Sequence, residues 1–235
     1  MPVLLLAQGD TPSKDMLRRA IEARYGLRPP ALESLQIDFK GRARAKLGPI
    51  TTWVPVETTA YFCFPNTMRW DFKMKAVGVQ VGSGIEGFDG TTYRIASGGK
   101  AATVISDPAL ISSMQQRLWA IAAVFLTPLG EHFVKLSCPG DNILQVTNMQ
   151  IDASIYLHLR PDHTLDYVKI DCINPDNNKL QDFKLCLSEE QSLVNDLMLP
   201  SKITSYWDSD PYFEVEPQRS ETNHHIDNAM FSLNA

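Results

Sequence analysis

The sequence predicts a mainly β (α+β) fold in which a large, curved antiparallel sheet encloses a helix. Apolar and polar residues alternate with a period of two along many short segments, which is typical of half-buried strands. Short turns connect these segments, and such turns suit antiparallel neighbours because parallel strands need a long crossover. The second half of one helix is apolar on all sides, so it has to be covered on several sides, and the simplest place for this helix is inside the curve of the sheet.

The chain begins with an apolar stretch at residues 1–9 that has no basic segment before it. We expect a remnant of a signal peptide or a flexible arm here, with a short first strand as the alternative. A signal remnant predicts an exported, periplasmic protein; a cytoplasmic location is the alternative. Residues 10–235 are expected to form a single domain, because no linker or internal repeat interrupts them.

The first helix is predicted to start at Thr11-Pro12, with proline in the first turn, and to end at Gly26. The period then changes to two. In the segment Arg69-Trp70-Asp71-Phe72, for example, the two aromatic side chains share one face of a strand and the two charged ones share the other. Strands are expected at residues 35–45, 52–64, 68–75, 77–81, 91–95 and 101–106.

Glycines between residues 78 and 99 are expected to separate these strands, and Asp89-Gly90 is typical of a tight hairpin turn. Residues 82–87 match the pattern G-x-G-x-x-G. A dinucleotide-binding loop needs a helix after this pattern, and here a hairpin turn follows, so no such cofactor is expected.

A second helix is predicted from Asp107-Pro108 to Leu126. Its first half is amphipathic, whereas Leu118 to Leu126 is apolar without interruption. This helix is too short to cross a bilayer. It is therefore the helix that we place inside the curve of the sheet.

The second half of the chain returns to the strand pattern after Gly130. The segment 188–198 has only a weak signal and is interpreted as a helical turn or a loop. Further strands are expected at residues 133–137, 143–147, 154–159, 166–173, 181–187, 203–207 and 212–216.

The composition excludes several classes of function. The net charge of −5 without a basic cluster argues against nucleic-acid binding. No apolar run approaches the roughly 18 residues of a membrane span, so a transmembrane protein is not expected. The histidines and the four cysteines lack the spacing of metal ligands, and neither a metal nor another cofactor is expected. Cys172 and Cys186 are interpreted as buried thiols or as a disulfide across a hairpin.

Three motifs carry a resemblance to a known family. They are the strand Arg69–Phe72, the turn Phe88-Asp89-Gly90-Thr91-Thr92-Tyr93 and the C-terminal segment Ile226-Asp227-Asn228-Ala229-Met230-Phe231. In this order and spacing the sequence resembles the LolA-like outer-membrane lipoprotein-sorting and lipoprotein carrier superfamily. The resemblance covers residues 33–233. It implies an incomplete β-barrel that helices close around an apolar cavity for acyl chains.

The resemblance also implies a role for Arg69 as the arginine that holds a lid by donating hydrogen bonds to its carbonyl groups. The alternative from the residues alone is a strand arginine balanced by Asp71. Trp70 and Phe72 lie on the opposite face of the same strand, and the sequence leaves open which face lines the cavity. The candidate ligand-binding and gating residues are Arg69, Trp70, Phe72, Leu118, Ile121 and Phe125.

The first functional hypothesis is a non-enzymatic carrier or binding protein for a hydrophobic small molecule, a lipid or the acyl chains of a lipoprotein. The alternative is a sensor or protein-interaction module with a protein partner. The third is an enzyme that reuses the cavity, with Tyr61, Asp71, Tyr93 and His158 as candidate residues. An extended segment at 50–57 and a polar insertion at 174–199 distinguish the chain from lipoprotein carriers and leave lipoprotein transfer open.

Overall fold

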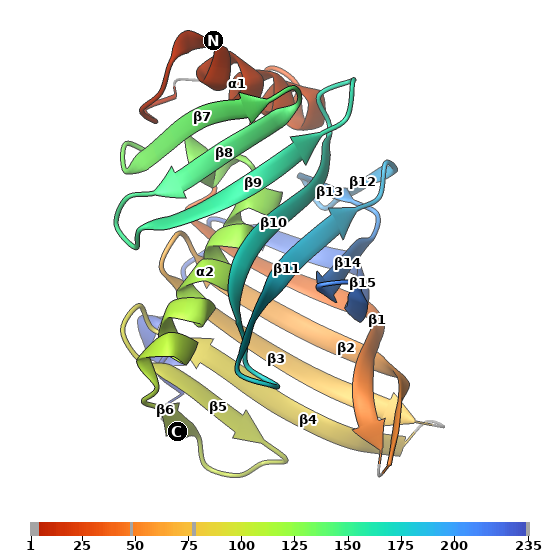
Figure 1. Ribbon diagram of the computed structural model, residues 1–235. Coiled ribbons are helices and arrows are strands. Elements are labelled where there is room, and N and C mark those ends of the chain that lie inside the picture. The colour runs from red at the N-terminus through yellow and green to blue at the C-terminus, as the bar shows by residue number, and fades with distance from the viewer. Residues whose placement is uncertain (1–4, 48, 77–78, 234–235) are drawn as a thin grey trace.

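The computed structural model describes residues 5–47, 49–76 and 79–233. Within these residues thirteen antiparallel strands form one strongly curved sheet in the order β6-β5-β4-β3-β2-β1-β15-β14-β11-β10-β9-β8-β7 (Figure 1). Pairing of β1 with β15 joins the two halves of the chain into this sheet. The sheet is not closed into a barrel, since β6 and β7 are its two edges. This confirms the predicted fold class.

The strands of the first half of the chain are β1 (Ser34–Leu47), β2 (Ile50–Cys63), β3 (Thr67–Ala76), β4 (Val79–Phe88), β5 (Tyr93–Ser97) and β6 (Thr103–Ile105). Those of the second half are β7 (Val134–Gly140), β8 (Ile143–Asn148), β9 (Ala153–Leu159), β10 (Leu165–Asn174), β11 (Lys179–Leu187), β12 (Gln191–Val194), β13 (Leu197–Pro200), β14 (Ile203–Trp207) and β15 (Asp210–Thr222). The α-helices are α1 (Thr11–Tyr25) and α2 (Pro108–Val124), and short 3-10 turns occur at η1 (Thr127–Gly130) and η2 (Asn228–Met230).

Helix α1 begins where the sequence predicts. The Asp10 carboxylate accepts a hydrogen bond from the Ser13 amide at 2.9 Å, and Gly26 ends the helix with a φ of 66°. The preceding residues lie against the sheet edge, because the Gln8 amide donates to the Val134 carbonyl at 2.7 Å. Residues 1–4 of the predicted signal remnant or arm lie outside the described residues.

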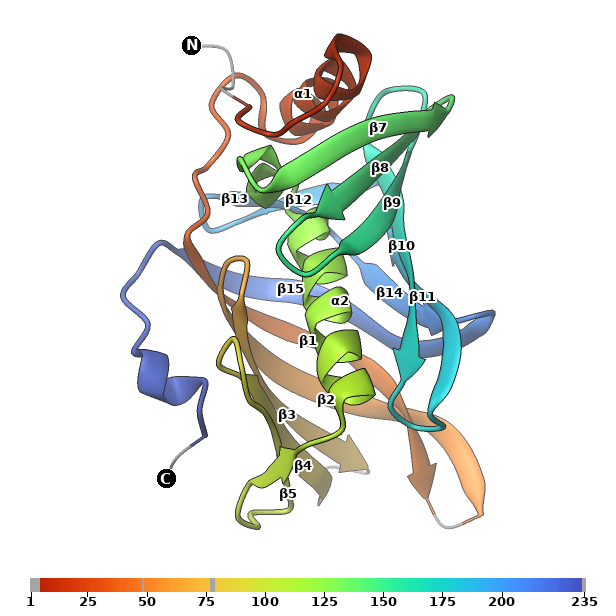
Figure 2. The ribbon, with the colours of Figure 1, turned by 60° about the vertical axis from the view of Figure 1, so that its left-hand side comes forward.

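Helix α2 connects the edge strands β6 and β7 and lies on the concave side of the sheet (Figure 2). It packs on β9, β10 and β11. Its second half is buried, and Trp119 is the largest side chain there with 1% of its surface exposed. Two side chains of α1 hold its C-terminal end: Arg24 donates to the Val124 carbonyl, and the Tyr25 hydroxyl donates to the Phe125 carbonyl at 3.0 Å.

Strand β4 corrects the prediction in this part of the chain. We expected a strand at 77–81 that ends at the glycines, but residues 77 and 78 lie outside the described residues and β4 continues to Phe88. Gly84 and Gly87 lie inside the strand. A Cβ atom on Gly84 would lie 2.5 Å from the Phe72 ring, so this glycine gives room to the neighbouring strand. The glycines misled the prediction because glycine is uncommon in strands, so a run of glycines in a sequence usually indicates turns.

The prediction of a helical turn or a loop at residues 188–198 is also wrong. The segment contains most of a hairpin, in which β12 pairs with β13.

The predicted disulfide alternative is excluded, because Cys172 and Cys186 are free thiols. Burial raises the pKa of Cys172 to about 11, so this thiol stays protonated at neutral pH. Among the described residues no helix is both long and apolar enough to cross a membrane.

Replacing Tyr25 with Phe is expected to lower the free energy of unfolding by about 1 kcal/mol, because the hydrogen bond to the end of α2 is lost. Urea denaturation measures this change. The control is Tyr156→Phe on β9, where the side chain is exposed and its hydroxyl has no hydrogen-bond partner among the described residues. Equal effects of the two substitutions would show that the contact with α2 contributes nothing.

A second prediction concerns the pH dependence of stability that results from Asp89. Burial alone raises the pKa of the Asp89 carboxyl, but donors from Thr91, Thr92 and Arg94 outweigh burial and hold this pKa at about 2, below the ordinary value of 3.8. The carboxylate therefore stabilises the fold above pH 3.8, and this contribution is lost as the pH falls toward 2.

Asp89→Asn is accordingly expected to be less stable than the wild type at neutral pH, with a difference that shrinks as the pH falls from about 4 to about 2. Thermal unfolding at a series of pH values measures it. Asp152→Asn, in an exposed turn, serves as the control. A difference that stays constant over this pH range would contradict the assignment.

Candidate functional site

An apolar cavity of about 410 Å³ lies between α2 and the concave face of strands β1 to β4 and β15. Its volume falls within the range of about 300 to 1,000 Å³ that is typical of small-molecule sites. The alternation of the strands explains the lining, because every second residue of β3 points inward. Side chains that line it include Met68, Trp70, Phe72, Ile121, Tyr212 and Phe213.

Aromatic rings form one wall of this cavity. Trp70 stacks on Phe39 with ring centroids 5.9 Å apart and lies 6.1 Å from the ring of Phe213. These rings come from β3, β1 and β15, which the register of the sheet brings onto the same face. The packing fixes the rings against one another, so the wall exists without a ligand.

Four charged residues line the cavity: Arg44 and Lys46 near the end of β1, and Glu86 and Arg117 deeper inside. Glu86 points inward because it lies opposite Trp70 in the β3–β4 register. Arg117 comes from α2 and its Nη2 atom lies 3.3 Å from Oε1 of Glu86. The Tyr93 hydroxyl donates a hydrogen bond to the same carboxylate oxygen. We call Glu86, Tyr93 and Arg117 the inner polar cluster.

The inner polar cluster combines a guanidinium, a carboxylate and a phenol hydroxyl. Burial lowers the pKa of the Arg117 guanidinium, but the neighbouring Glu86 and Tyr93 together outweigh burial and raise this pKa overall. Burial and the same carboxylate raise the pKa of Tyr93, so its hydroxyl stays neutral. The cluster therefore has a net charge of zero.

The structure brings three of the six candidate residues together. Trp70, Phe72 and Ile121 line the cavity. The face of β3 that carries Trp70 and Phe72 is therefore the inner face. Leu118 and Phe125 do not line it; they are buried in the core with exposed fractions of 1% and 2%. Leu118 lies on α2 and Phe125 follows its C-terminal end, and a gating role for these two side chains stays a prediction.

Arg69 lies on the outer face of β3, away from the cavity. Its guanidinium pairs with Asp71, with Nε 2.7 Å from Oδ1, and Nη1 donates to the Met230 carbonyl at 3.2 Å. It does hold a carbonyl group, but that group belongs to the C-terminal segment and not to a lid over the cavity. The pair with Asp71 corresponds to the alternative from the residues alone, whereas the hydrogen bond to Met230 is not a contact with a lid.

The C-terminal segment 226–233 packs on the outer face of the sheet (Figure 2). Phe231 is fully buried there, and a Cβ atom on Gly87 would lie 2.7 Å from the Phe231 carbonyl oxygen. Gly87 is therefore the position at which β4 gives room for this segment.

The four residues considered for an enzyme lie in three places. Tyr61 and Asp71 line a groove of about 870 Å³ on the outer face of the sheet. Tyr93 belongs to the inner polar cluster, and His158 on β9 stacks on Tyr167 with ring centroids 4.1 Å apart. The structure thus does not bring them together into one site. Within the described part of the chain, no group of three His, Cys, Asp or Glu residues could hold a metal ion.

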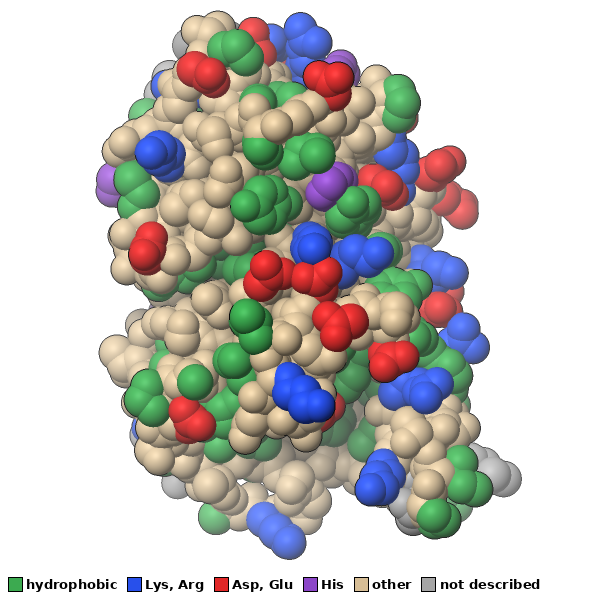
Figure 3. All heavy atoms as spheres, viewed as in Figure 1, with side chains coloured by type: hydrophobic (Ala, Val, Ile, Leu, Met, Phe, Trp, Pro, Cys, Tyr) green, Lys and Arg blue, Asp and Glu red, His purple; other side chains and the backbone are tan. Residues whose placement is uncertain are grey.

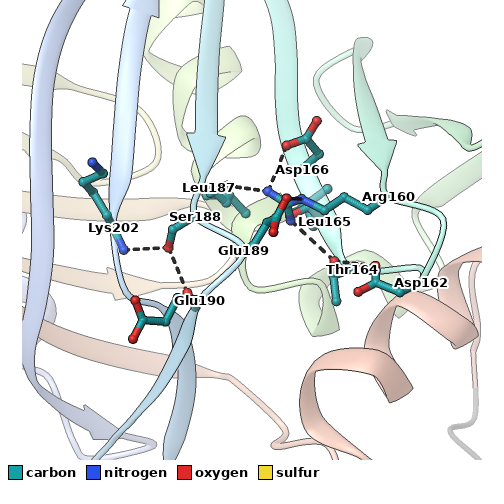
Figure 4. Close-up of polar contacts among 10 residues, drawn as sticks. All are labelled: Arg160, Asp162, Thr164, Leu165, Asp166, Leu187, Ser188, Glu189, Glu190 and Lys202. Carbon is teal, nitrogen blue, oxygen red and sulfur yellow. Dashed lines mark hydrogen bonds and ion pairs between the residues drawn. The ribbon is translucent and has the colours of Figure 1, made fainter.

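Two other polar groupings have structural roles. Acidic and basic side chains gather over β10 and β11 (Figure 3), where Lys169 and Asp182 form an ion pair of 2.7 Å. Arg160 joins the β9–β10 turn to the end of β11 (Figure 4). It donates to the carbonyls of Leu165 and Leu187 at 2.7 and 2.6 Å. Backbone carbonyls occupy its donors, so this arginine acts as a clamp within the sheet.

No protein-family model and no curated protein matches the sequence. Solved structures do match the architecture. A LolA superfamily protein from Nitrosomonas europaea has a TM-score of 0.52 at 9% identity, with 93% of this chain and 96% of that chain covered. A domain from Vibrio parahaemolyticus named for outer membrane lipoprotein sorting has a TM-score of 0.52 at 8% identity, with 94% and 98% covered.

The chain has a LolA-like fold. A DUF1329 family protein from Desulfovibrio piger also resembles it, with a TM-score of 0.51 at 11% identity and 94% and 98% of the two chains covered. At these identities the likeness concerns the fold alone.

Sequence reasoning missed Glu86 and Arg117, the charged residues inside this LolA-like fold. Glu86 lies within a glycine-rich segment that was interpreted as turns, and Arg117 follows two glutamines on the polar side of a helix. A single continuous strand from Val79 to Phe88 would have shown that Glu86 shares a face with Phe88. No signal in the sequence links either residue to the other.

Arg69→Gln is expected to loosen the C-terminal segment of this LolA-like fold, because the hydrogen bond to Met230 is lost. Limited proteolysis should then cleave after residue 225 several times faster than in the wild type. Lys73→Gln is the control, since Lys73 is an exposed residue on the same face of β3. Unchanged cleavage in Arg69→Gln would contradict this function of Arg69.

Proposed function

We propose that the protein binds a lipid or another acyl ligand in the cavity between α2 and the sheet and acts as a carrier or binding protein rather than as an enzyme. The observation that supports this most is the cavity itself. It is lined mainly by aromatic and aliphatic side chains from α2 and from several strands of the sheet, which the fold holds apart. An apolar chain would fill such a space better than water would.

Apolar burial would provide most of the affinity. Each 100 Å² of ligand surface removed from water contributes about 2.5 kcal/mol before the cost of association. The wall rings of Trp70 and Phe213 are already packed against each other, and Phe39 supports Trp70. These side chains therefore lose little conformational entropy when a ligand binds, and this favours the bound state.

The ligand needs no movement of α2 to enter. Arg44 and Lys46 near the end of β1 are exposed and also line the cavity, so the cavity reaches the surface there. Arg24 and Tyr25 hold the C-terminal end of the helix. The function of α2 in this proposal is that of a fixed wall.

The names of two similar structures agree with this proposal, since they belong to the LolA superfamily and to outer membrane lipoprotein sorting. A carrier for the acyl chains of a lipid or a lipoprotein is the corresponding function here. A protein partner would have the outer groove at Tyr61 and Asp71 as its site.

Filling the cavity tests the proposal. Ile121→Trp places a larger side chain in the cavity and is expected to weaken the binding of a fluorescent fatty-acyl probe at least about tenfold, because the ligand loses its space. Titration of the probe, followed by its emission and by tryptophan fluorescence, measures this affinity.

Ser112→Trp adds the same side chain at an exposed position of α2 and should bind the probe like the wild type. Circular dichroism shows whether each variant is folded. Wild-type affinity in a folded Ile121→Trp variant, or no binding of acyl probes by the wild type, would exclude the cavity as a lipid site. Capture of a protein partner by wild type without bound lipid would then favour the interaction module.

A further inference from the structure

Arg117 has hydrogen-bond donors that the protein itself does not fully use. Its contacts with Glu86 Oε1, the Tyr93 hydroxyl and Met114 Sδ all involve Nη2, at 3.3, 3.4 and 3.3 Å. The two contacts with oxygen are longer than the usual 2.9 to 3.0 Å. The Nε atom is buried and has no partner among the described residues.

Such an arrangement is unusual for a purely structural arginine. A buried donor without an acceptor is destabilising, and most buried polar groups have a partner. Arg160, which is equally enclosed, donates to two carbonyls at 2.6 and 2.7 Å. Arg117 instead borders the cavity, and its Nη1 atom has no hydrogen bond among the described residues and is not fully buried, so an acceptor that enters the cavity could pair with Nη1.

The charge of the inner polar cluster indicates which kind of acceptor fits. Glu86 already balances Arg117, and the Tyr93 hydroxyl donates to the same carboxylate. A second carboxylate beside Glu86 would be repelled in this apolar surrounding. An uncharged carbonyl oxygen adds a hydrogen bond without adding a charge, and a hydrogen bond from a charged donor is stronger than one between neutral groups.

The surroundings of the cluster complete the description of the ligand. Met114 and Ile121 of α2 and the ring of Trp70 continue the lining with apolar groups. A ligand with one polar end and a long apolar chain matches this distribution.

We propose that Arg117 is a specificity-determining residue that donates a hydrogen bond to the carbonyl oxygen of an esterified or amide-linked acyl chain. Glu86 and Tyr93 position the guanidinium. This inference rests on the proposed carrier function and adds the chemical class of the ligand, an uncharged acyl derivative rather than a plain hydrocarbon or a free fatty acid.

Matched ligands test the inference. Methyl palmitate, palmitate and hexadecane are compared by displacement of a bound fluorescent hydrocarbon probe at pH 8. Wild-type protein is expected to bind methyl palmitate about tenfold more tightly than hexadecane, as one charge-assisted hydrogen bond predicts. It should also bind the ester more tightly than the acid. Amide-linked and ester-linked chains of equal length then distinguish the two forms of carbonyl.

The double substitution Glu86→Gln with Arg117→Met removes the donor and keeps the cluster uncharged. This variant is expected to lose the preference for the ester and to keep its affinity for hexadecane. Arg117→Lys keeps a cation for Glu86 but removes the second terminal nitrogen, Nη1, and should weaken the preference if the double variant does not fold. The control removes an ion pair on the outer face, Glu57→Gln with Lys75→Met, which are 2.7 Å apart in the wild type.

The outcomes separate the two proposals. If hexadecane and methyl palmitate bind equally well, the carrier function stands and the function of Arg117 is refuted. An ester preference that survives in both Arg117 variants refutes it as well, and tighter binding of palmitate refutes an uncharged ligand. If none of the three ligands displaces the probe, the carrier function fails and this inference fails with it.

Discussion

Helix α2 runs from β6 to β7, the two edges of an open curved sheet, and therefore has to cross the concave side of that sheet. Its apolar second half is stable there because β9, β10 and β11 cover it. Two side chains of α1 donate hydrogen bonds to the backbone carbonyls at its buried C-terminal end. The cavity exists because the same helix stands away from strands β1 to β4.

This arrangement gives the two faces of the sheet different chemistry. The inner face carries Trp70 and Phe72 toward the cavity, while the outer face carries the Arg69–Asp71 pair and the C-terminal segment. On the inner face Glu86 and Arg117 add a pair of opposite charges to the otherwise apolar side chains of β3 and α2. In the proposed function, this polar cluster would orient a ligand whose apolar chain is held by burial.

Much of the fold follows from local patterns. The long alternation that begins at Leu35, the apolar stretch from Leu118 and the Asp89-Gly90 turn each correspond to an element of the structure. The prediction failed where a residue serves a distant neighbour. Gly84 accommodates the Phe72 ring of another strand, and Gly87 accommodates Phe231. A local rule assigns such glycines to turns because it has no information about these contacts.

The sequence by itself determined that Trp70 and Phe72 lie opposite Arg69, since a strand has a period of two. Only the tertiary structure decided which of these faces looks onto α2, because the period is the same for either choice. It also decided that Leu118 and Phe125 belong to the core, and that Glu86 and Arg117 meet although they are 31 positions apart. Their contact depends on the register of β3 with β4 and on the path of α2 across the sheet, and both result from packing of the whole domain.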